Sequence, residues 1–330
     1  ARETISKILN CRSSEIIFTS GGTESNNLAI FGTAKTAGTK NRHLITSKIE
    51  HSSVLEPFQK LEKEGFESTY LKTDREGFVN LEDLKGSLRP DTTLVSIMYA
   101  NNEIGTIEPI PEIGQICHEA NVTFHTDACQ AGGSLLLDTQ ELNVDMMTLN
   151  AGKIYGPKGV GLLFIRRGTK IEQIIFGGGQ EQNLRSGTHN VPGIIGFAKA
   201  LQLAHSEQKE ENARLVLLRD RLIEGILKIE KTHLNGPRTQ RLPNNVNVTI
   251  EDIEAPHLVL VLDEAGIYTS TGSACRIGEI SHSPVLLAIG LTDTQTQSTL
   301  RLTLGKKTTE QDIDFTIRTL TEIVQKLRNH

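Results

Sequence analysis

The stretch that decides the fold reads Asn-Ala-Gly-Lys-Ile-Tyr-Gly-Pro-Lys-Gly and occupies residues 150–159. An apolar run at 144–149 precedes it, and a second at 160–165 follows it. Two apolar runs joined by a polar, glycine-rich link predict two buried strands. Lys153 then lies at the exit of the first strand, among small residues that let another group approach closely. Taken alone, a solvated lysine explains this position about as well as a buried amine with a chemical role, because most lysines face water.

An acidic residue upstream favours the chemical role. Asp127 ends the short run Phe124-His125-Thr126-Asp127. In parallel α/β sheets, ligands bind at the carboxyl ends of the strands. A lysine and an aspartate at two such ends suit pyridoxal 5'-phosphate (PLP). The lysine forms a Schiff base with it, and the carboxylate keeps the pyridine nitrogen protonated so that the ring can accept electrons.

The composition is that of an ordinary globular protein. The chain has 330 residues, enough for one large domain or two, with 37% hydrophobic and 23% charged residues. A net charge of -5 and the lack of a long basic run argue against nucleic-acid and membrane-surface partners. No apolar stretch has the length of a membrane span, and the first residues look like an amphipathic helix, not a signal peptide.

The four cysteines, Cys11, Cys117, Cys129 and Cys275, form no CxxC pair and no zinc-type spacing. We therefore expect no metal site and a reducing, cytoplasmic compartment. The first three lie in or beside apolar stretches and are expected to be inert.

Apolar runs alternate with helical patterns in the first half of the chain. Strands are predicted at residues 15–20, 43–47, 67–71, 93–99 and 122–126. This alternation predicts a mostly parallel α/β sheet with helices on both faces. Polar residues follow these strands at Thr23, His51, Asn102, Asp127, Gln130 and Lys153. Six polar residues at equivalent strand ends indicate one shared site.

A glycine turn, Gly21-Gly22-Thr23, separates the first predicted strand from a helical pattern. Such a turn is suited to an anion, because free backbone N–H groups and the positive end of the helix dipole both point at it. The P-loop pattern GxxxxGK[ST] is absent. Taken alone, a short strand-to-helix turn is the favoured explanation.

The second half contains a glycine-rich polar loop, which includes Gly177-Gly178-Gly179-Gln180 and Arg185-Ser186-Gly187-Thr188. A long helix is predicted at 191–228, with a charged run at 207–214. We place the domain change there, between a large PLP-binding domain at 1–207 and a small domain at 208–330 that carries a cysteine loop. In the small domain, strands are predicted at 246–249, 267–269 and 298–304 and helices at 256–265 and from 310.

These motifs resemble the PLP-dependent cysteine desulfurases of group I, the NifS/IscS type. The resemblance extends from Ser20 to Arg301 and is carried by four motifs, at 101–105 (Asn-Asn-Glu-Ile-Gly), 153–159, 185–188 and 272–275 (Gly-Ser-Ala-Cys). It implies PLP-dependent fold type I, the aspartate-aminotransferase-like fold. It also implies a homodimer whose active site lies at the subunit interface.

The resemblance implies a role for each matching residue. Lys153 forms the Schiff base, Asp127 pairs with the pyridinium, and His51 stacks on the ring. The remaining cofactor-binding positions are Gly22, Thr23, Asn102, Gln130, Asn150 and, from the other subunit, Thr188. Of these, Gln130 bonds the ring hydroxyl, and Gly22, Thr23 and Thr188 bind the phosphate.

The implied substrate is L-cysteine, whose carboxylate is held by Asn102 and Arg301. Lys153 moves the Cα proton, and the Cys275 thiolate attacks the substrate sulfur. The products are alanine and a persulfide on Cys275, which passes to an acceptor such as an iron–sulfur cluster scaffold. Arg301 within a β-branched run is better explained by bidentate binding of a carboxylate than by a surface role.

The chain departs from the family pattern at two places. The family's histidine before the Schiff-base lysine is Gly152 here, and the serine two residues earlier is Asn150. Both family side chains help to hold the phosphate, so we expect a weaker grip on the cofactor. The N-terminal family segment with its Asn-Ala-Thr motif is also absent from this sequence.

Two other functions fit the same pattern. Selenocysteine lyase or aminotransferase activity would use the same fold, although a transaminase has no need of the Cys275 thiol. A catalytically impaired, desulfurase-like protein that binds a partner is the second alternative, favoured by Gly152 and the missing segment.

Overall fold

The computed structural model describes residues 1–38, 41–271 and 282–329. The chain forms two compact units. The first unit comprises Ala1–Lys72, Val79–Ala100 and Glu108–Gln208. The second comprises Thr73–Phe78, Asn101–Ile107 and Lys209–His330.

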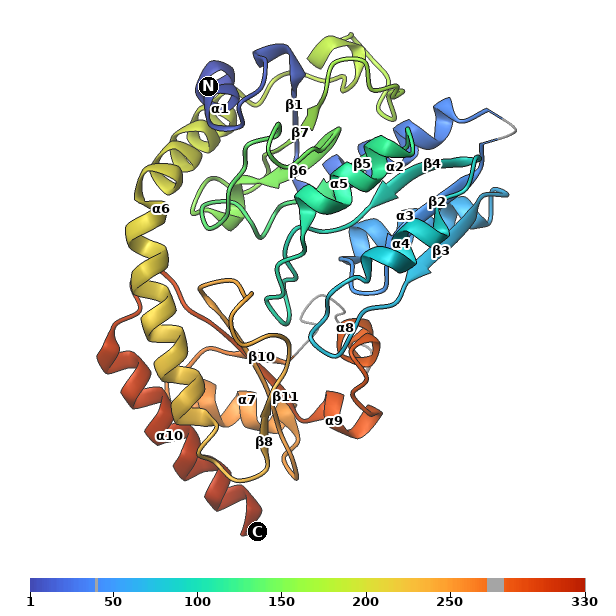
Figure 1. The fold of residues 1–330 in the computed structure, drawn as a ribbon. Helices are drawn as coiled ribbons and strands as arrows, with labels where there is room; N and C mark the ends of the chain where they lie inside the picture. The colour runs from blue at the N-terminus through green and yellow to red at the C-terminus, as the bar shows by residue number, and fades with distance from the viewer. Residues whose placement is uncertain (39–40, 272–281, 330) are drawn as a thin grey trace. The chain divides into compact units, whose positions relative to one another are not determined.

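A seven-stranded sheet forms the centre of the first unit (Figure 1). Its strands are β1 (Ile16–Thr19), β2 (His43–Ser47), β3 (Glu67–Leu71), β4 (Thr92–Ser96), β5 (Thr123–Asp127), β6 (Met146–Asn150) and β7 (Gly161–Ile165). Their order across the sheet is β1-β7-β6-β5-β4-β2-β3. The pairs from β6 to β3 are parallel, and β7 runs antiparallel to both β6 and β1. The mostly parallel sheet that the sequence predicts is therefore confirmed.

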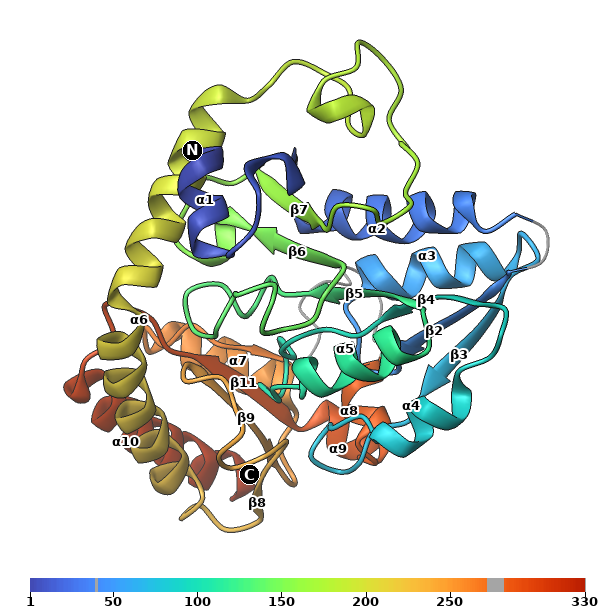
Figure 2. The ribbon, with the colours of Figure 1, turned by 45° about the horizontal axis from the view of Figure 1, so that its top comes forward.

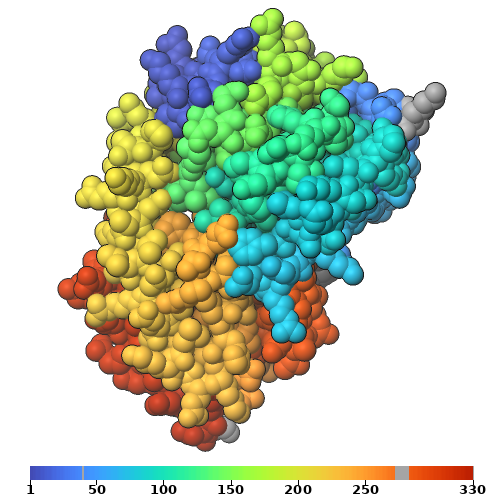
Figure 3. Space-filling model, in the orientation of Figure 1, coloured from blue at the N-terminus to red at the C-terminus, as the bar shows by residue number. Residues whose placement is uncertain are grey.

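Helices cover both faces of this sheet. Figure 2 shows α2 (Gly22–Thr36) and α3 (Ser52–Glu62) on one face, with α4 (Leu81–Ser87) and α5 (Ile110–Glu119) on the other. In the space-filling view, the side chains of α4 and α5 hide the strands behind them (Figure 3). The core between α2, α3 and the sheet includes Leu28, Ile30 and Phe58, all of them buried. Short helices α1 (Arg2–Ile8), η1 (Ser13–Glu15), η2 (Ala151–Lys153) and η3 (Glu181–Asn183) complete this unit.

Two predicted strands differ from the structure. The strand predicted at 93–99 ends at Ser96, although Ile97 and Tyr99 still donate backbone hydrogen bonds to His125 and Asp127 of β5. Residues 267–269 do not form a strand, and β10 occupies Ser270–Thr271 instead. In both places, the positions of the backbone hydrogen-bond partners determine which residues form the strand, and the β-branched side chains do not.

The second unit is built on an antiparallel sheet of four strands in the order β10-β11-β9-β8. The remaining strands are β8 (Thr232–Leu234), β9 (Asn245–Ile250) and β11 (Thr299–Thr303). Its helices are α7 (Ala255–Glu264), α8 (Pro284–Ala288), α9 (Asp293–Gln297) and α10 (Glu310–Arg328), with the C-terminal part of α6 (Val191–Ile226). The core includes Val246, Val248, Leu300 and Leu320.

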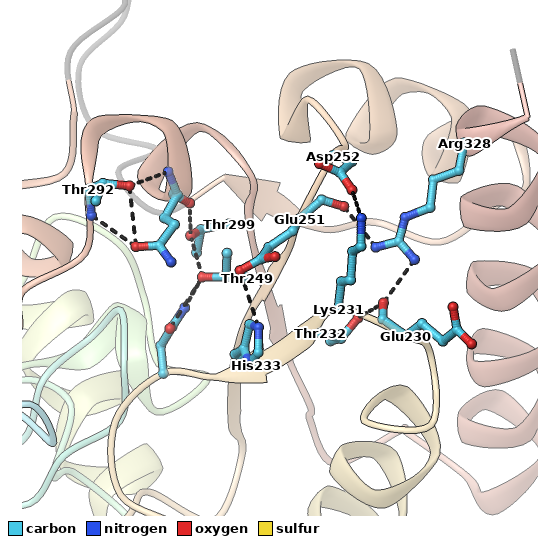
Figure 4. A network of polar contacts seen from close by, with 12 residues as sticks. Glu230, Lys231, Thr232, His233, Thr249, Glu251, Asp252, Thr292, Thr299 and Arg328 are labelled. Atoms are coloured by element: carbon cyan, nitrogen blue, oxygen red, sulfur yellow. Dashed lines mark hydrogen bonds and ion pairs between the residues drawn. The ribbon is translucent and has the colours of Figure 1, made fainter.

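Polar contacts fasten the end of α10 to the β8–β9 hairpin (Figure 4). Arg328 donates from Nη1 to the carbonyl oxygen of Glu230 at 2.8 Å and from Nη2 to that of Glu251 at 2.7 Å. Lys231 and Asp252 form an exposed ion pair at 2.7 Å across the same hairpin. The guanidinium therefore satisfies the carbonyl groups shortly before β8 and directly after β9, at the end of the hairpin opposite its connecting loop.

None of the helices within the described ranges is long and apolar enough to cross a membrane.

Candidate active site

The start of α2 forms an open cradle next to β6. Gly21 has φ 154° and ψ −179°, a conformation open essentially only to glycine, and α2 begins at the next residue. A Cβ atom on Gly22 would approach Cys129 Sγ to 2.7 Å and would lie 3.8 Å from Asn150 Nδ2. No side chain therefore fits at Gly22, whereas a Cβ atom on Gly21 would meet nothing within 4 Å, so the approach to the first backbone N–H groups of the helix is open at Gly21. Those N–H groups have no partner within the helix and favour an anion.

Asn150 contributes a further donor to this cradle. It is the last residue of β6, and its Oδ1 accepts the N–H of Gly152 at 3.2 Å in the turn that leads to Lys153. With the oxygen used in this way, the amide nitrogen is left as a donor, 3.8 Å from the position that a Cβ atom on Gly22 would take. Asn150 Nδ2 and the helix N-terminus together suit a phosphate group.

Asp127 ends β5 with its carboxylate held at both oxygens. Oδ2 accepts from Asn26 Nδ2 at 2.7 Å, and Oδ1 accepts from the backbone N–H of Cys129 at 2.9 Å. The residue is only 6% exposed. Donors at both oxygens fix the carboxylate in one orientation.

His51 is connected to Asp127 through two side chains. His51 Nδ1 accepts the N–H of Ser53 at 3.1 Å, which caps α3, and it also lies 2.8 Å from Ser53 Oγ. Asn26 Nδ2 donates to that Oγ at 2.8 Å as well as to Asp127. Because Nδ1 acts as an acceptor, the ring proton of neutral His51 lies on Nε2. The sequence-predicted residues His51 and Asp127 thus belong to one hydrogen-bond network.

Cys129 lies between the predicted site residues. Burial, reinforced by the negative charge of Asp127, raises the pKa of the Cys129 thiol well above its usual range. The Lys153 ammonium lies within electrostatic reach and acts in the opposite direction. The thiol therefore stays uncharged at neutral pH. Lys153 is exposed at the end of η2, and Gln130 is half-buried next to Cys129.

Sequence reasoning assigned no role in the site to Asn26 or Ser53. Asn26 lies four residues after Gly22, so both residues point to the same side of α2. This helical spacing from the glycine turn is the signal that could have identified Asn26. The role of Ser53 depends on contacts with Asn26, 27 residues away in sequence, which no local pattern reveals.

Thr188 lies on an exposed loop of the first unit. Arg185 holds this loop to α2 through hydrogen bonds from Nε and Nη2 to the two Glu24 carboxylate oxygens, at 2.7 and 3.2 Å. Glu181 holds its other end, because its buried carboxylate contacts His189 Nδ1 at 2.9 Å and accepts the N–H of Phe18 at 2.8 Å. Thr188 is thus presented at the surface by a fixed loop.

Asn102 and Arg301 meet within the second unit. Arg301 lies on β11, and its Nη1 donates to the carbonyl oxygen of Asn102 at 3.4 Å. Beside them, the carboxyl group of buried Glu103 accepts from Ser283 Oγ at 2.6 Å, and burial raises its pKa. Arg301 also pairs with Ser270 of β10. Cys275 lies outside the described residues.

The first unit therefore offers the donor set that PLP requires. The N-terminus of α2 and Asn150 suit the phosphate, the fixed Asp127 carboxylate suits a protonated ring nitrogen, and Lys153 supplies an amine. The open space at Gly21 leaves room for a group to reach the backbone at the start of α2.

Known proteins are similar to this one in sequence over nearly the whole chain. Residues 1–315 match the class-V aminotransferase family. A cysteine desulfurase IscS of Dictyoglomus turgidum is 52% identical over 329 residues, covering 99% of this chain and 84% of the relative. The IscS of Methanosarcina thermophila is also 52% identical over 329 residues, covering 100% of this chain and 81% of the relative.

Solved structures lead to the same family. A NifS-like protein superposes with a TM-score of 0.92 at 38% identity, covering 98% of this chain and 86% of the other. A structure of SspA in complex with cysteine superposes with a TM-score of 0.79 at 36% identity, covering 92% of this chain and 85% of the other. The expected fold type and family resemblance are confirmed. The chain belongs to the class-V aminotransferase family, whose cysteine desulfurases are PLP-dependent enzymes.

Proposed function

We propose that this chain is a PLP-dependent cysteine desulfurase that converts L-cysteine to L-alanine and keeps the sulfur as a persulfide on Cys275. The observation that carries the proposal is the network from His51 through Ser53 and Asn26 to Asp127, next to the cradle at Gly22. Relatives that are 52% identical over nearly the whole chain bear the name cysteine desulfurase. When bound, PLP supplies an electron sink for the electrons of the substrate Cα–H bond.

The residues of the proposed site have separate tasks in this reaction. Asp127 keeps the ring nitrogen protonated, and His51 covers the ring face. Lys153 holds the cofactor and moves the substrate Cα proton. Arg301 and Asn102 bind the substrate carboxylate, for which the guanidinium offers a planar, bidentate donor pair.

Cys275 takes the sulfur. Its thiolate forms a bond with the substrate sulfur while the Cβ–S bond of the substrate breaks, and the electron pair of that bond stays with the carbon. Protonation of the carbon then completes alanine. The resulting persulfide carries sulfur to an acceptor protein, for which an iron–sulfur cluster scaffold is the candidate that the IscS relatives favour.

The assembly we propose is a homodimer in a reducing, cytoplasmic compartment. The exposed position of Thr188 on a fixed loop supports a contact with the phosphate of the partner subunit's cofactor. A reducing compartment is consistent with thiols at Cys11, Cys117 and Cys129 that form no disulfide.

The test is product analysis of the PLP-loaded protein with L-cysteine. Wild type should release alanine and, with a reducing thiol present, an equal amount of sulfide. Lys153→Ala should lose the visible cofactor band and both products. Cys275→Ala should keep the band and its response to cysteine but release no sulfide.

Lys170→Ala and Cys11→Ala are the matched controls, since they remove a lysine and a cysteine to which we assign no role. Both controls should behave as wild type. Sulfide release by Cys275→Ala at the wild-type rate would exclude the persulfide route, and an unchanged band in Lys153→Ala would exclude this lysine.

A further inference from the structure

Glu50 is a buried acidic residue to which the reaction described above assigns no task. It directly precedes His51, lies between the end of β2 and the start of α3, and is 2% exposed. Its Oε1 accepts from Ser47 Oγ at 2.6 Å and from the backbone N–H of Met98 at 2.9 Å. The carboxyl group thus ties the end of β2 to the segment that follows β4.

The second oxygen of Glu50 is in a different situation. Oε2 is buried, and within the described ranges no donor reaches it. A charged carboxylate with a bare, buried oxygen is far more costly than an uncharged carboxyl group in the same place. The geometry therefore favours a proton on Glu50.

Asp127 strengthens this preference. The charge of Asp127, at the end of β5, acts on Glu50, whereas β2 contributes the Ser47 hydroxyl and the segment after β4 contributes the Met98 amide. Burial, the larger cause, and the charge of Asp127 together raise the pKa of Glu50 to about 8, against the opposing hydrogen bonds from Ser47 and Met98. Two carboxyl groups that share a buried site do not both ionise readily.

The hydrogen-bond donors around Asp127 and Glu50 are arranged differently. Asp127 receives N–H donors at both oxygens, whereas Glu50 receives both of its donors at one oxygen. The single negative charge of the pair is therefore best placed on Asp127.

We propose that Glu50 is a positioning residue of the cofactor site, a carboxyl group that keeps its proton at neutral pH so that Asp127 alone carries the negative charge toward the ring nitrogen. The same group holds the turn that presents His51. This inference rests on the role of Asp127 in the proposed function, and it adds a residue that acts through Asp127 and His51 without touching the cofactor.

The first test measures the proton on Glu50 without reference to the cofactor. The full chain, freed of PLP, is unfolded with urea between pH 5 and pH 9 for wild type and for Glu50→Gln, which keeps the acceptor but cannot ionise. Because folding raises the pKa of Glu50 from 4.5 to about 8, its contribution to stability is complete below pH 4.5 and is lost as the pH rises to about 8.

Relative to Glu50→Gln, the unfolding equilibrium constant of wild type should therefore rise by up to about tenfold per pH unit within that window. Ser47→Ala removes a hydrogen bond that lowers the pKa of Glu50. In this variant, the pH range over which the contribution of Glu50 to stability is lost should therefore extend to higher pH. Glu112→Gln removes an exposed carboxylate from α5 and is the control. The pH dependence of its unfolding equilibrium constant should match that of wild type. Parallel profiles for wild type and Glu50→Gln would overturn the proposal.

The second test measures what the proton does to the site. In the PLP-loaded protein, the cofactor absorbance of wild type should have a component that titrates near pH 8, absent in Glu50→Gln and moved to higher pH in Ser47→Ala. Spectra of wild type and Glu50→Gln with the same pH dependence would overturn the positioning role. The variant Asp127→Asn distinguishes the proposed role of Asp127 from the proposed proton on Glu50. An unchanged cofactor spectrum in that variant would refute the role of Asp127, whereas the urea unfolding profiles would still report on the proton of Glu50.

Discussion

Gly152 directly precedes Lys153 and contributes no side-chain donor to the phosphate site that we propose there. Its backbone lies in η2 without a positive φ, so the position does not require glycine. A Cβ atom there would lie 3.6 Å from Asn150 Oδ1 and 3.9 Å from Lys158 Cγ, which are ordinary contacts. A side chain is therefore tolerated at this position, and the backbone conformation does not require glycine there.

Gly152→His should tighten PLP binding. An imidazole N–H at this position adds one charge-assisted hydrogen bond to the phosphate, worth about 1.5–3 kcal/mol. PLP retention on dialysis is the measurement, with Gly152→Ala as the control that adds a side chain without a donor. Retention in the histidine variant no better than in Gly152→Ala would mean that the phosphate is anchored elsewhere.

Asn26→Ala should loosen the cofactor and destabilise the fold. Asn26 is fully buried, and its loss leaves Asp127 Oδ2 and Ser53 Oγ without their donor, at a cost of about 1–3 kcal/mol. Urea unfolding and PLP retention are measured together. The control is Asn27→Ala, which removes only a hydrogen bond to Thr23 within the same helix and should cost much less. Equal effects of the two substitutions would argue against the network.

At the scale of elements, the site depends on where strands end and helices begin. Strands β5 and β6 end at Asp127 and Asn150, and α2 and α3 begin at Gly22 and directly after His51. Adjacent parallel strands bring their carboxyl ends to one edge of the sheet, where the following loops carry the polar side chains. His51 belongs to this edge both as a helix cap and as a side chain of the site.

These two tasks of His51 can be separated by substitution. His51→Ala should lose the cap of α3, about 0.5–2 kcal/mol of stability, together with the ring contact. His51→Asn restores a capping oxygen but no aromatic ring, so it should recover the stability while the cofactor spectrum stays altered. Thermal unfolding and absorbance distinguish the two effects. A normal spectrum in His51→Asn would exclude stacking of this ring on the cofactor.

At the scale of the whole molecule, the first unit exposes several large apolar side chains in the part of the chain that carries Thr188. Tyr155 and Phe176 are each 71% exposed, Ile195 is 58% exposed and Val191 is 54% exposed. Exposed apolar groups of this size commonly mark protein interfaces. They lie in the same part of the sequence as Thr188, which supports an interface that includes the loop.

Phe176→Glu combined with Ile195→Glu should convert a dimer into monomers and weaken PLP binding, because each cofactor would lose Thr188 of the partner subunit. Light scattering and PLP retention are measured on the same samples. Leu217→Glu is the control, an equally exposed apolar residue of α6 that lies in the second unit and is 73% exposed. A monomer with full PLP affinity would exclude the shared site.

The sequence by itself determined the order of the elements and most of the chemistry. The strands at 43–47 and 67–71 have the predicted bounds, and each is followed directly by a lysine, Lys48 and Lys72. Lys153 and Asp127 could be singled out because a strand end is recognisable from local pattern, and the four motifs specified the family.

Only the tertiary structure decided which distant groups meet. Asn26 reaches Asp127 across 101 residues, and Arg301 reaches Asn102 across 199, because segment 101–107 packs with the second unit and not with the strands that flank it. The proton on Glu50 likewise depends on burial and on Asp127, neither of which the residues around position 50 reveal. Periodicity reports on contacts within one element, whereas hydrogen-bond partners and burial are set by the packing of elements far apart in the chain.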